Sequence, residues 1–322
     1  MKVFVTGASG FIGRNLLCAL SVGGHEVTAL THLSEVSAGV RAVRGDVEAP
    51  ASYEGALEGM DVVLHAAALV DPIDDEARAD AVNHRATLAL AAAAQTRHVP
   101  TFIFLSSIAA LGMPWDAGWV PESAPCRPHT PYARSKRAAE VGLLALERPE
   151  FRVVVVRPPT VYGSDDTRGN FLGLARAVQT GLFWVPGARQ NRVSFCHVDN
   201  LTHALERLAA SPGARGIIHV ADDMTTRFGE VVGLMGRTLG ARVPRVPFPL
   251  PLAQWAVAGL EQLGRWGRFA PPLSRARLAS ITCDFAFDLG KLRGLGVTAP
   301  LTFEAAAVRT LRAYQKAGLL RR

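Results

Sequence analysis

The turn that follows the first apolar run constrains the fold of this chain more than any other feature. A strand-like MKVFVT leads directly into the glycine-rich TGASGFIG, residues 6–13, and then into an apolar, helix-like segment. Glycines at such a junction let the backbone approach a pyrophosphate and let the helix pack closely on the strand. Unpaired amides at the helix N-terminus favour an anion there. We therefore predict a dinucleotide site built on Gly7, Gly10, Phe11, Ile12 and Gly13.

Short β-branched runs alternate with Ala- and Leu-rich stretches through the first half of the chain. This alternation is typical of βαβ units and predicts a parallel sheet with helices on both faces. Strands are expected at 2–6, 26–30, 41–44, 61–65, 101–105 and 152–156, and helices at 11–22, 77–97 and 132–147. The consecutive valines of the last strand indicate a central position, buried on both faces. Beyond residue 162 proline and glycine become frequent, and the helices there are expected to be short.

The expected architecture is an α/β, doubly wound parallel-sheet Rossmann fold with a smaller C-terminal substrate-binding lobe. Residues 1–165 are assigned to the dinucleotide-binding core, which later segments near 192–222 complete. Residues 166–322 are assigned mainly to the substrate-binding lobe. The composition of 49% hydrophobic and 20% charged residues excludes a disordered or fibrous protein.

The formal net charge is +7, and the excess comes from the last quarter of the chain, with thirteen basic and four acidic residues from Arg242 to Arg322. These arginines are spread among apolar residues and prolines, so we interpret them as a solvated face, with an acidic ligand or a membrane headgroup as the alternative. A nucleic-acid partner is not expected. The four cysteines lie far apart, without metal-ligand spacing, so neither a metal site nor a disulfide framework is expected. With a strand-like start and no membrane-length apolar run, we expect a cytoplasmic protein, with membrane association as an alternative.

The end of the second expected strand bears on the choice of cofactor. In NAD-binding versions of this arrangement an acidic residue at that place holds the adenosine ribose hydroxyls. Here the stretch reads ALTHLS, and the first carboxylate, Glu35, comes later. Thr31, His32 and Ser34, with Arg14 on the neighbouring helix, suit a 2′-phosphate instead. We therefore favour NADP(H) over NAD(H), which stays open.

A tyrosine and a lysine stand four residues apart in Tyr132-Ala-Arg-Ser-Lys136. On a helix this spacing places the phenol and the ammonium on one face, and a nearby cation lowers a tyrosine pKa from about 10. Basic residues of this chain are mostly arginine, so a lysine at this position indicates a need for a compact ammonium. Ser106 and Ser107 end the fifth expected strand at the carboxyl edge of the sheet, where α/β proteins bind their ligands.

Taken together, these motifs resemble the extended short-chain dehydrogenase/reductases, and the likeness covers essentially the whole chain. The matching segments are TGASGFIG, the turn Gly45-Asp46-Val47, the run His65-Ala66-Ala67-Ala68, Asn83, Ser107, the pair Tyr132 and Lys136, and the RPPTVYG segment from Arg157 to Gly163. The resemblance implies that Asp46, Val47, Ala66, Ala67, Tyr132, Lys136, Pro158 and Val161 contact the cofactor, in addition to His32 from the end of the second strand. It also implies hydride transfer, with Tyr132 as general acid/base, Ser107 bonding the reacting oxygen and Lys136 holding the nicotinamide ribose.

The substrate class follows from departures within the family. Ile108 and alanines follow Ser107, where dehydratases carry an acidic pair, and Val193 stands where nucleotide-sugar enzymes tend to have an arginine. The segment from Asn191 to Asn200 instead resembles the 3β-hydroxysteroid dehydrogenase-like branch. We therefore expect a secondary alcohol or ketone of an apolar, sterol- or triterpenoid-like molecule as substrate. The alternatives are a nucleotide-sugar 4-epimerase or reductase, and a dinucleotide-sensing binding protein without turnover.

Two further expectations concern the surroundings of the site and the partners. Aromatic and sulfur-containing side chains are expected around the pocket mouth, namely Met113, Trp115, Trp119, Phe183 and Trp184. The stretch from Phe248 to Phe269 has the pattern of an amphipathic helix, which suits either a membrane surface or the core. The family often pairs through the helix that carries the tyrosine, so a homodimer is expected.

Overall fold

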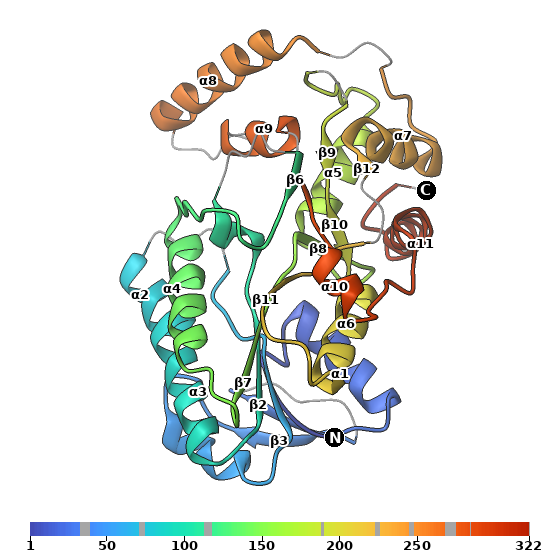
Figure 1. Ribbon diagram of the computed structural model, residues 1–322. Helices are drawn as coiled ribbons and strands as arrows, with labels where there is room; N and C mark the ends of the chain where they lie inside the picture. The colour runs from blue at the N-terminus through green and yellow to red at the C-terminus, as the bar shows by residue number, and fades with distance from the viewer. Residues whose placement is uncertain are drawn as a thin grey trace.

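A computed structural model describes residues 1–32, 39–70, 75–112, 118–187, 190–222, 226–244, 248–267, 275–283 and 285–321. The chain forms a sheet with helices on both sides at its N-terminal end and a second lobe at the other end (Figure 1). Ser34, Glu35, Met113 and Trp115, which the sequence analysis singled out, lie outside the described residues.

Seven strands form the central sheet in the order β11-β7-β5-β4-β1-β2-β3, and every neighbouring pair is parallel. The strands are β1 (Lys2–Thr6), β2 (Glu26–Thr31), β3 (Arg41–Arg44), β4 (Val62–His65), β5 (Thr101–Leu105), β7 (Arg152–Arg157) and β11 (Gly216–His219). The order reverses direction at β1, so the crevice above β1 and β4 is the topological switch point where such sheets bind ligands. The predicted doubly wound fold is confirmed.

Helices cover both faces of the sheet. On one face α1 (Phe11–Val22) packs against α6 (Val198–Ala210), and on the other α3 (Ala86–Thr96) packs against α4 (Pro131–Ala145), as Figure 1 shows. Side chains alternate between these two cores because successive residues of a strand point to opposite faces. Val3 and Val5 lie in the α1 and α6 core, whereas Phe4 lies in the α3 and α4 core. Full burial of a valine is worth about 1.5 to 3 kcal/mol, so the valine-rich strands fix the register of the sheet.

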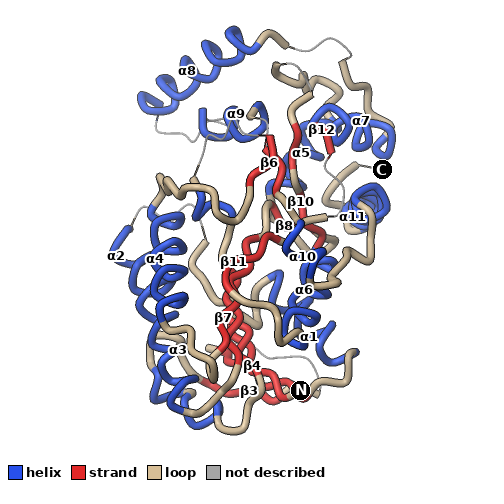
Figure 2. The backbone as a smooth tube through the Cα atoms, viewed as in Figure 1, coloured by secondary structure: helices blue, strands red, loops and turns tan. Residues whose placement is uncertain are grey.

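The C-terminal lobe consists of short strand pairs and helices, visible as separate red pairs in Figure 2. The pairs are β8 (Thr160–Tyr162) with β10 (Phe195–His197), β9 (Arg192–Val193) with β12 (Thr226–Arg227), and β6 (Gly118–Val120) with β13 (Phe285–Phe287). The helices are α5 (Asn170–Gln179), α7 (Phe228–Leu239), α8 (Leu250–Gly267), α9 (Arg275–Thr282), α10 (Gly290–Gly294) and α11 (Phe303–Lys316). An apolar core of α5, α7 and α11 residues holds most of the lobe together.

The chain crosses between the two parts in both directions. β6, from the first half of the sequence, pairs with the late strand β13, and β11 returns from the second half to pair with β7. Strands from the two sides of residues 165 and 166 therefore pair with each other. The predicted domain boundary at this point stays a prediction.

The helix expected at 77–97 is confirmed as one continuous helical stretch, which runs through α2 (Glu76–Asp80), a π-helical turn at Ala81–Arg85, and α3. The turn is centred on Asn83, whose side chain is hydrogen-bonded to the backbone of Leu69, while the Thr87 hydroxyl donates to the Asn83 carbonyl (2.8 Å). One local expectation was wrong, because the helices after residue 162 are not all short. Helix α8 has 18 residues and lies within the stretch 248–269 that was expected to form an amphipathic helix.

None of the helices within the described ranges has both the length and the apolar character required to cross a bilayer.

Candidate active site

The glycine turn between β1 and α1 is closed in a way that only glycine permits. Gly7 has φ +75°, and a Cβ added there would lie 2.6 Å from the carbonyl carbon of Ala66. A Cβ on Gly13 would collide with the Gly7 carbonyl, while the Gly10 amide donates to that carbonyl (3.0 Å). No side chain caps the N-terminus of α1 at Gly10, so its first amides are open to an anionic ligand. A dinucleotide pyrophosphate fits this cradle.

The other residues of the turn connect it to the rest of the site. Phe11 is half-buried against Gly163, since a Cβ on that glycine would lie 3.2 Å from the Phe11 ring. Ile12 packs against the core beneath α1. The glycine turn is thereby in contact with the end of the RPPTVYG segment.

At the end of β2 the structure brings His32 next to Asp46. His32 Nδ1 lies 3.7 Å from Asp46 Oδ2, and the two side chains are 70% and 42% exposed. Val47 packs partly into the core below them. Arg14 is exposed on α1, and its guanidinium donates to the Ser9 carbonyl (2.6 Å). A carboxylate is therefore present beside His32, which the sequence around the second strand did not reveal.

The segment after β4 is held by a buried histidine. His65 bridges Thr6 (2.6 Å from Nδ1) and Thr87 (2.8 Å from Nε2), and burial, with a smaller effect of the Lys136 charge, lowers the pKa of His65 to about 3. Thr6 Oγ1 in turn accepts from the Ala67 amide (3.2 Å). The backbone at Ala66 and Ala67 is thus fixed directly over the glycine turn, where the sequence places cofactor contacts.

Helix α4 presents the predicted catalytic pair. Thr130 caps the helix by accepting from the Ala133 amide (3.1 Å), and Pro131 occupies the first helical position, which places Tyr132 in the first turn. Lys136, one turn later, is only 2% exposed, and its Nζ donates to the Leu105 carbonyl (2.8 Å) and lies 4.5 Å from the Phe104 ring centroid. Burial lowers the pKa of Lys136 to about 7, an effect that the charge of Glu140 opposes.

Ser107 lies at the carboxyl end of β5, two residues after the carbonyl that binds Lys136. Its Oγ accepts from the Ala109 amide (3.1 Å), which starts a short 3₁₀ turn over Ile108–Leu111 that packs against α4. The neighbouring Ile108 amide donates to the Pro158 carbonyl (3.1 Å), and Val161 pairs with Cys196 in the adjoining strand pair. Ser107, Lys136 and Pro158 therefore lie together near the carboxyl ends of β5 and β7. His32 and Asp46 lie on the other side of β1, after the ends of β2 and β3.

The described members of the predicted pocket group, Trp119, Phe183 and Trp184, have different packing partners. Trp119 is half exposed on β6, with the Arg192 guanidinium 5.8 Å from its ring centroid. Phe183 packs against Phe228, and Trp184 packs against Phe248. Trp119 lies on β6, whose Val120 shares an apolar cluster with Leu111 of the 3₁₀ turn after Ser107.

A buried ion pair that the sequence analysis missed joins helix α4 to the end of β7. Glu140 and Arg157 are both fully buried, with Arg157 Nε 2.7 Å from Oε1 and Nη2 2.6 Å from Oε2. Ser106 Oγ also donates to Oε1 (2.6 Å). The available signal was the spacing of Tyr132, Lys136 and Glu140, which places all three on one face of α4.

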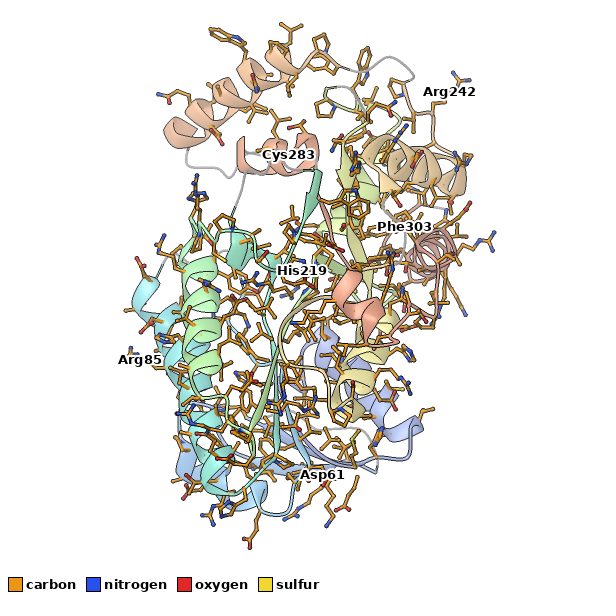
Figure 3. The ribbon with its side chains drawn as sticks, in the orientation of Figure 1. Asp61, Arg85, His219, Arg242, Cys283 and Phe303 are labelled. Carbon is orange, nitrogen blue, oxygen red and sulfur yellow. The ribbon has the colours of Figure 1, made fainter. Side chains whose placement is uncertain are left out.

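A second missed cluster surrounds Asp222, which follows β11 and is 4% exposed. Its carboxylate accepts from the Tyr162 hydroxyl (2.9 Å), the His197 amide (2.8 Å) and the Asn200 side chain (2.7 Å). Burial raises the pKa of Asp222 to about 6. His219, the last residue of β11, lies between the sheet and the C-terminal lobe in Figure 3. Asp222 comes three residues later, so its hydrogen bonds link the end of this sheet strand to the RPPTVYG segment through Tyr162. In the sequence, Asp222 and Asp223 follow an apolar strand, and this pattern did not indicate that Asp222 is a buried hydrogen-bond acceptor.

Comparison with known proteins agrees with this arrangement. The sequence pattern of the NAD dependent epimerase/dehydratase family matches residues 3–221. The chain belongs to that family. The predicted resemblance to extended short-chain dehydrogenase/reductases is confirmed, and so is the prediction of an enzyme of this class.

Family members of both predicted substrate branches are similar to this chain. A 4-hydroxy-2-methyl-3-oxo-4-farnesyl-3,4-dihydroquinoline-1-oxide ketoreductase of Stigmatella aurantiaca is 35% identical over 260 residues, which are 77% of each chain. A 3 beta-hydroxysteroid dehydrogenase/Delta 5→4-isomerase of Mycobacterium tuberculosis is 26% identical over 97% of this chain and 90% of its own. The Thermus thermophilus UDP-glucose 4-epimerase complex with NAD shares the fold, with a TM-score of 0.74, 23% identity, and coverage of 98% of this chain and 100% of the other.

Proposed function

We propose that this enzyme interconverts a secondary alcohol and a ketone on an apolar substrate of the sterol, steroid or triterpenoid kind. The observation that carries the proposal is the 35% identity to a ketoreductase whose named substrate bears a farnesyl chain. Val193 supports it, because this residue is 4% exposed in the apolar core of the lobe, where nucleotide-sugar enzymes tend to have an arginine.

Residues of this chain supply the proton chemistry and the positioning. The nicotinamide, when bound, supplies hydride exchange at its C4 carbon. Tyr132 moves a proton between its phenol oxygen and the substrate oxygen, and Ser107 hydrogen-bonds to that same oxygen. Lys136, one helical turn after Tyr132, supplies positive charge when its amine is protonated. Its bond to the Leu105 carbonyl ties α4 to the strand that leads to Ser107.

The cofactor we propose is NADP(H). Support comes from the polar, exposed His32 at the end of β2, together with Arg14, which is exposed on the neighbouring helix. A 2′-phosphate would accept hydrogen bonds from both side chains, although Asp46 competes for His32.

The substrate class is tested with the purified protein, NADPH or NADH, and a panel of 3-keto and 3-hydroxy sterols, following absorbance of the reduced nicotinamide. We expect sterol-dependent turnover and loss of about 10²- to 10⁴-fold in kcat for Tyr132→Phe, with dinucleotide binding retained. UDP-sugar binding without sterol turnover would establish the epimerase alternative. A Tyr132→Phe variant with unchanged biological activity would establish the non-catalytic, dinucleotide-sensing alternative.

We further propose a homodimer formed through α4, whose Val141 is 53% exposed. Sedimentation velocity at micromolar concentration tests this state. A single species with the mass of one chain would refute it.

A further inference from the structure

Helix α8 has an apolar side that the described part of the chain leaves uncovered. The exposed fractions are 56% for Leu252, 79% for Trp255, 36% for Leu260 and 58% for Leu263. Ala256 and Gly259 are exposed between them. We call these six residues the outer face of α8. Their spacings of three and one residues keep them on a single side of the helix.

Only a narrow stripe of α8 packs against other described residues. Ala253 and Val257 pack against Leu278 of α9 and form a small separate core, with Phe248 beside it. The outer face lies next to this packed stripe, so α8 is apolar over far more of its circumference than its contacts use. An ordinary surface helix carries charged or polar residues at such positions.

Two more exposed apolar side chains extend this surface. Leu182 is 79% and Trp184 is 47% exposed, and the Trp184 ring lies 6.0 Å from that of Phe248 at the base of α8. The Phe248 amide donates to the Val185 carbonyl (2.9 Å), which fixes the loop there. Six of the eleven large exposed apolar side chains in the described ranges therefore belong to α8 or to this loop. Figure 1 shows α8 at the end of the molecule away from the N-terminus.

The charge of the surrounding sequence identifies the partner. Residues 241–283 contain six arginines and one acidic residue, Glu261. An apolar helix face with tryptophan and leucine, within a strongly basic segment, matches the chemistry of an anionic bilayer surface, which offers acyl chains and negative headgroups together. A soluble partner protein would have to carry an apolar surface and negative charge side by side on one part of its surface. We propose that the outer face of α8 docks this enzyme onto an anionic lipid bilayer.

Docking would give the enzyme access to substrates that dissolve in the bilayer, but the surface itself does not depend on the proposed reaction. The test therefore uses no substrate. The 322-residue chain is mixed with sucrose-loaded vesicles of phosphatidylcholine alone or with about 30% phosphatidylglycerol, and the bound fraction is measured after centrifugation. The test variant is Trp255→Ser with Leu263→Ser. The matched control is Val22→Ser with Val70→Ser, two exposed apolar positions outside this surface, at 84% and 68% exposure.

We expect the wild-type chain to bind anionic vesicles more tightly than neutral ones, with affinity that falls as salt is added. The α8 double variant is expected to lose at least about tenfold in affinity, while the control double variant binds as the wild type does. Circular dichroism melting shows whether each variant is folded. Wild-type protein that stays in the supernatant would overturn the proposal, and so would equal binding by the α8 variant. Dimer dissociation in the α8 variant, without vesicle binding by the wild type, would assign the face to a second copy of the chain.

Discussion

The guanidinium of Arg157 forms two hydrogen bonds to the carboxylate of Glu140, at 2.7 and 2.6 Å, and neither side chain reaches solvent. Arg157 ends β7 and Glu140 lies on α4, so this pair fixes the helix of Tyr132 and Lys136 against the strand that leads into Pro158. Removing the Glu140 carboxylate would leave the Arg157 guanidinium buried without that partner, whereas Glu140 also accepts from Arg137 Nη1 (3.0 Å).

Glu140→Gln is therefore expected to lower the free energy of unfolding by about 3 to 5 kcal/mol, as is usual when one member of a buried pair is lost. Urea denaturation of both proteins measures the difference. The matched control is Glu147→Gln, which breaks a partly exposed ion pair with Arg215 (3.0 Å) and is expected to cost only about 0 to 1 kcal/mol. Equal effects of the two variants would contradict the role assigned to burial.

Gly13→Ala is expected to disrupt both the fold and dinucleotide binding, because the added Cβ collides with the Gly7 carbonyl. We expect a loss of about 1 to 3 kcal/mol in stability and a large loss of NADPH affinity by calorimetry. Gly173→Ala is the control, since that glycine lies inside α5 with open space around its Cβ position. This control is expected to gain about 0.5 to 1 kcal/mol from helix propensity. Unimpaired binding by Gly13→Ala would refute the assigned cradle.

His65 makes the stability of the enzyme fall in acid. The folded chain keeps this imidazole neutral down to about pH 3, whereas the unfolded chain protonates it near pH 6.5. Between these values the unfolded chain holds more protons, so the free energy of unfolding decreases as the pH falls, by up to about 1.4 kcal/mol per pH unit from this group. His65→Gln is expected to flatten that part of the profile, measured by denaturation from pH 7 to 4. An unchanged slope would show that other groups dominate.

Tyr162 and Asp222 are expected to be energetically coupled through their 2.9 Å hydrogen bond. A double-mutant cycle of Tyr162→Phe and Asp222→Asn should give a coupling free energy of about 1 to 3 kcal/mol. Tyr314→Phe provides the comparison, because the Tyr314 hydroxyl donates to the Gly163 carbonyl instead of to Asp222 (2.9 Å). Its cycle with Asp222→Asn is expected to be additive within about 0.5 kcal/mol. Equal coupling in the two cycles would count against a specific bond.

The cofactor choice is expected to depend on His32 and Asp46 in opposite directions. His32→Ala should weaken NADPH binding by about tenfold, or roughly 1.4 kcal/mol, and leave NADH binding unchanged. Asp46→Asn should raise the preference for NADPH, because a carboxylate 3.7 Å from His32 opposes a phosphate there. Calorimetric titration of both nucleotides measures these changes. Tighter NADH than NADPH binding by the wild-type chain would refute the NADP(H) proposal.

The elements near the glycine turn could be predicted from the sequence because their causes are local. β1, α1, β3 and β5 begin and end where strand alternation, glycine and proline indicated, and the helix of Tyr132 starts only one residue earlier than predicted, at the proline. The position of Ser107 at the carboxyl edge of the sheet follows from strand order, since parallel strands present their carboxyl ends together. Lys136 reaches that edge from α4, through its bond to the Leu105 carbonyl.

Other properties arise only when distant segments meet. The sequence of α4 determines that Tyr132, Lys136 and Glu140 share a face, but only packing on β7 pairs Glu140 with an arginine 17 residues away and buries Lys136 enough to lower its pKa. Asp222 becomes a buried acceptor because β11 returns to the sheet beside β7. The apolar pattern of α8 is a property of its sequence, whereas its exposure is decided by how little of the described part of the C-terminal lobe packs against it. Periodicity and turn chemistry act over a few residues, whereas burial and charge pairing depend on contacts that no local sequence contains.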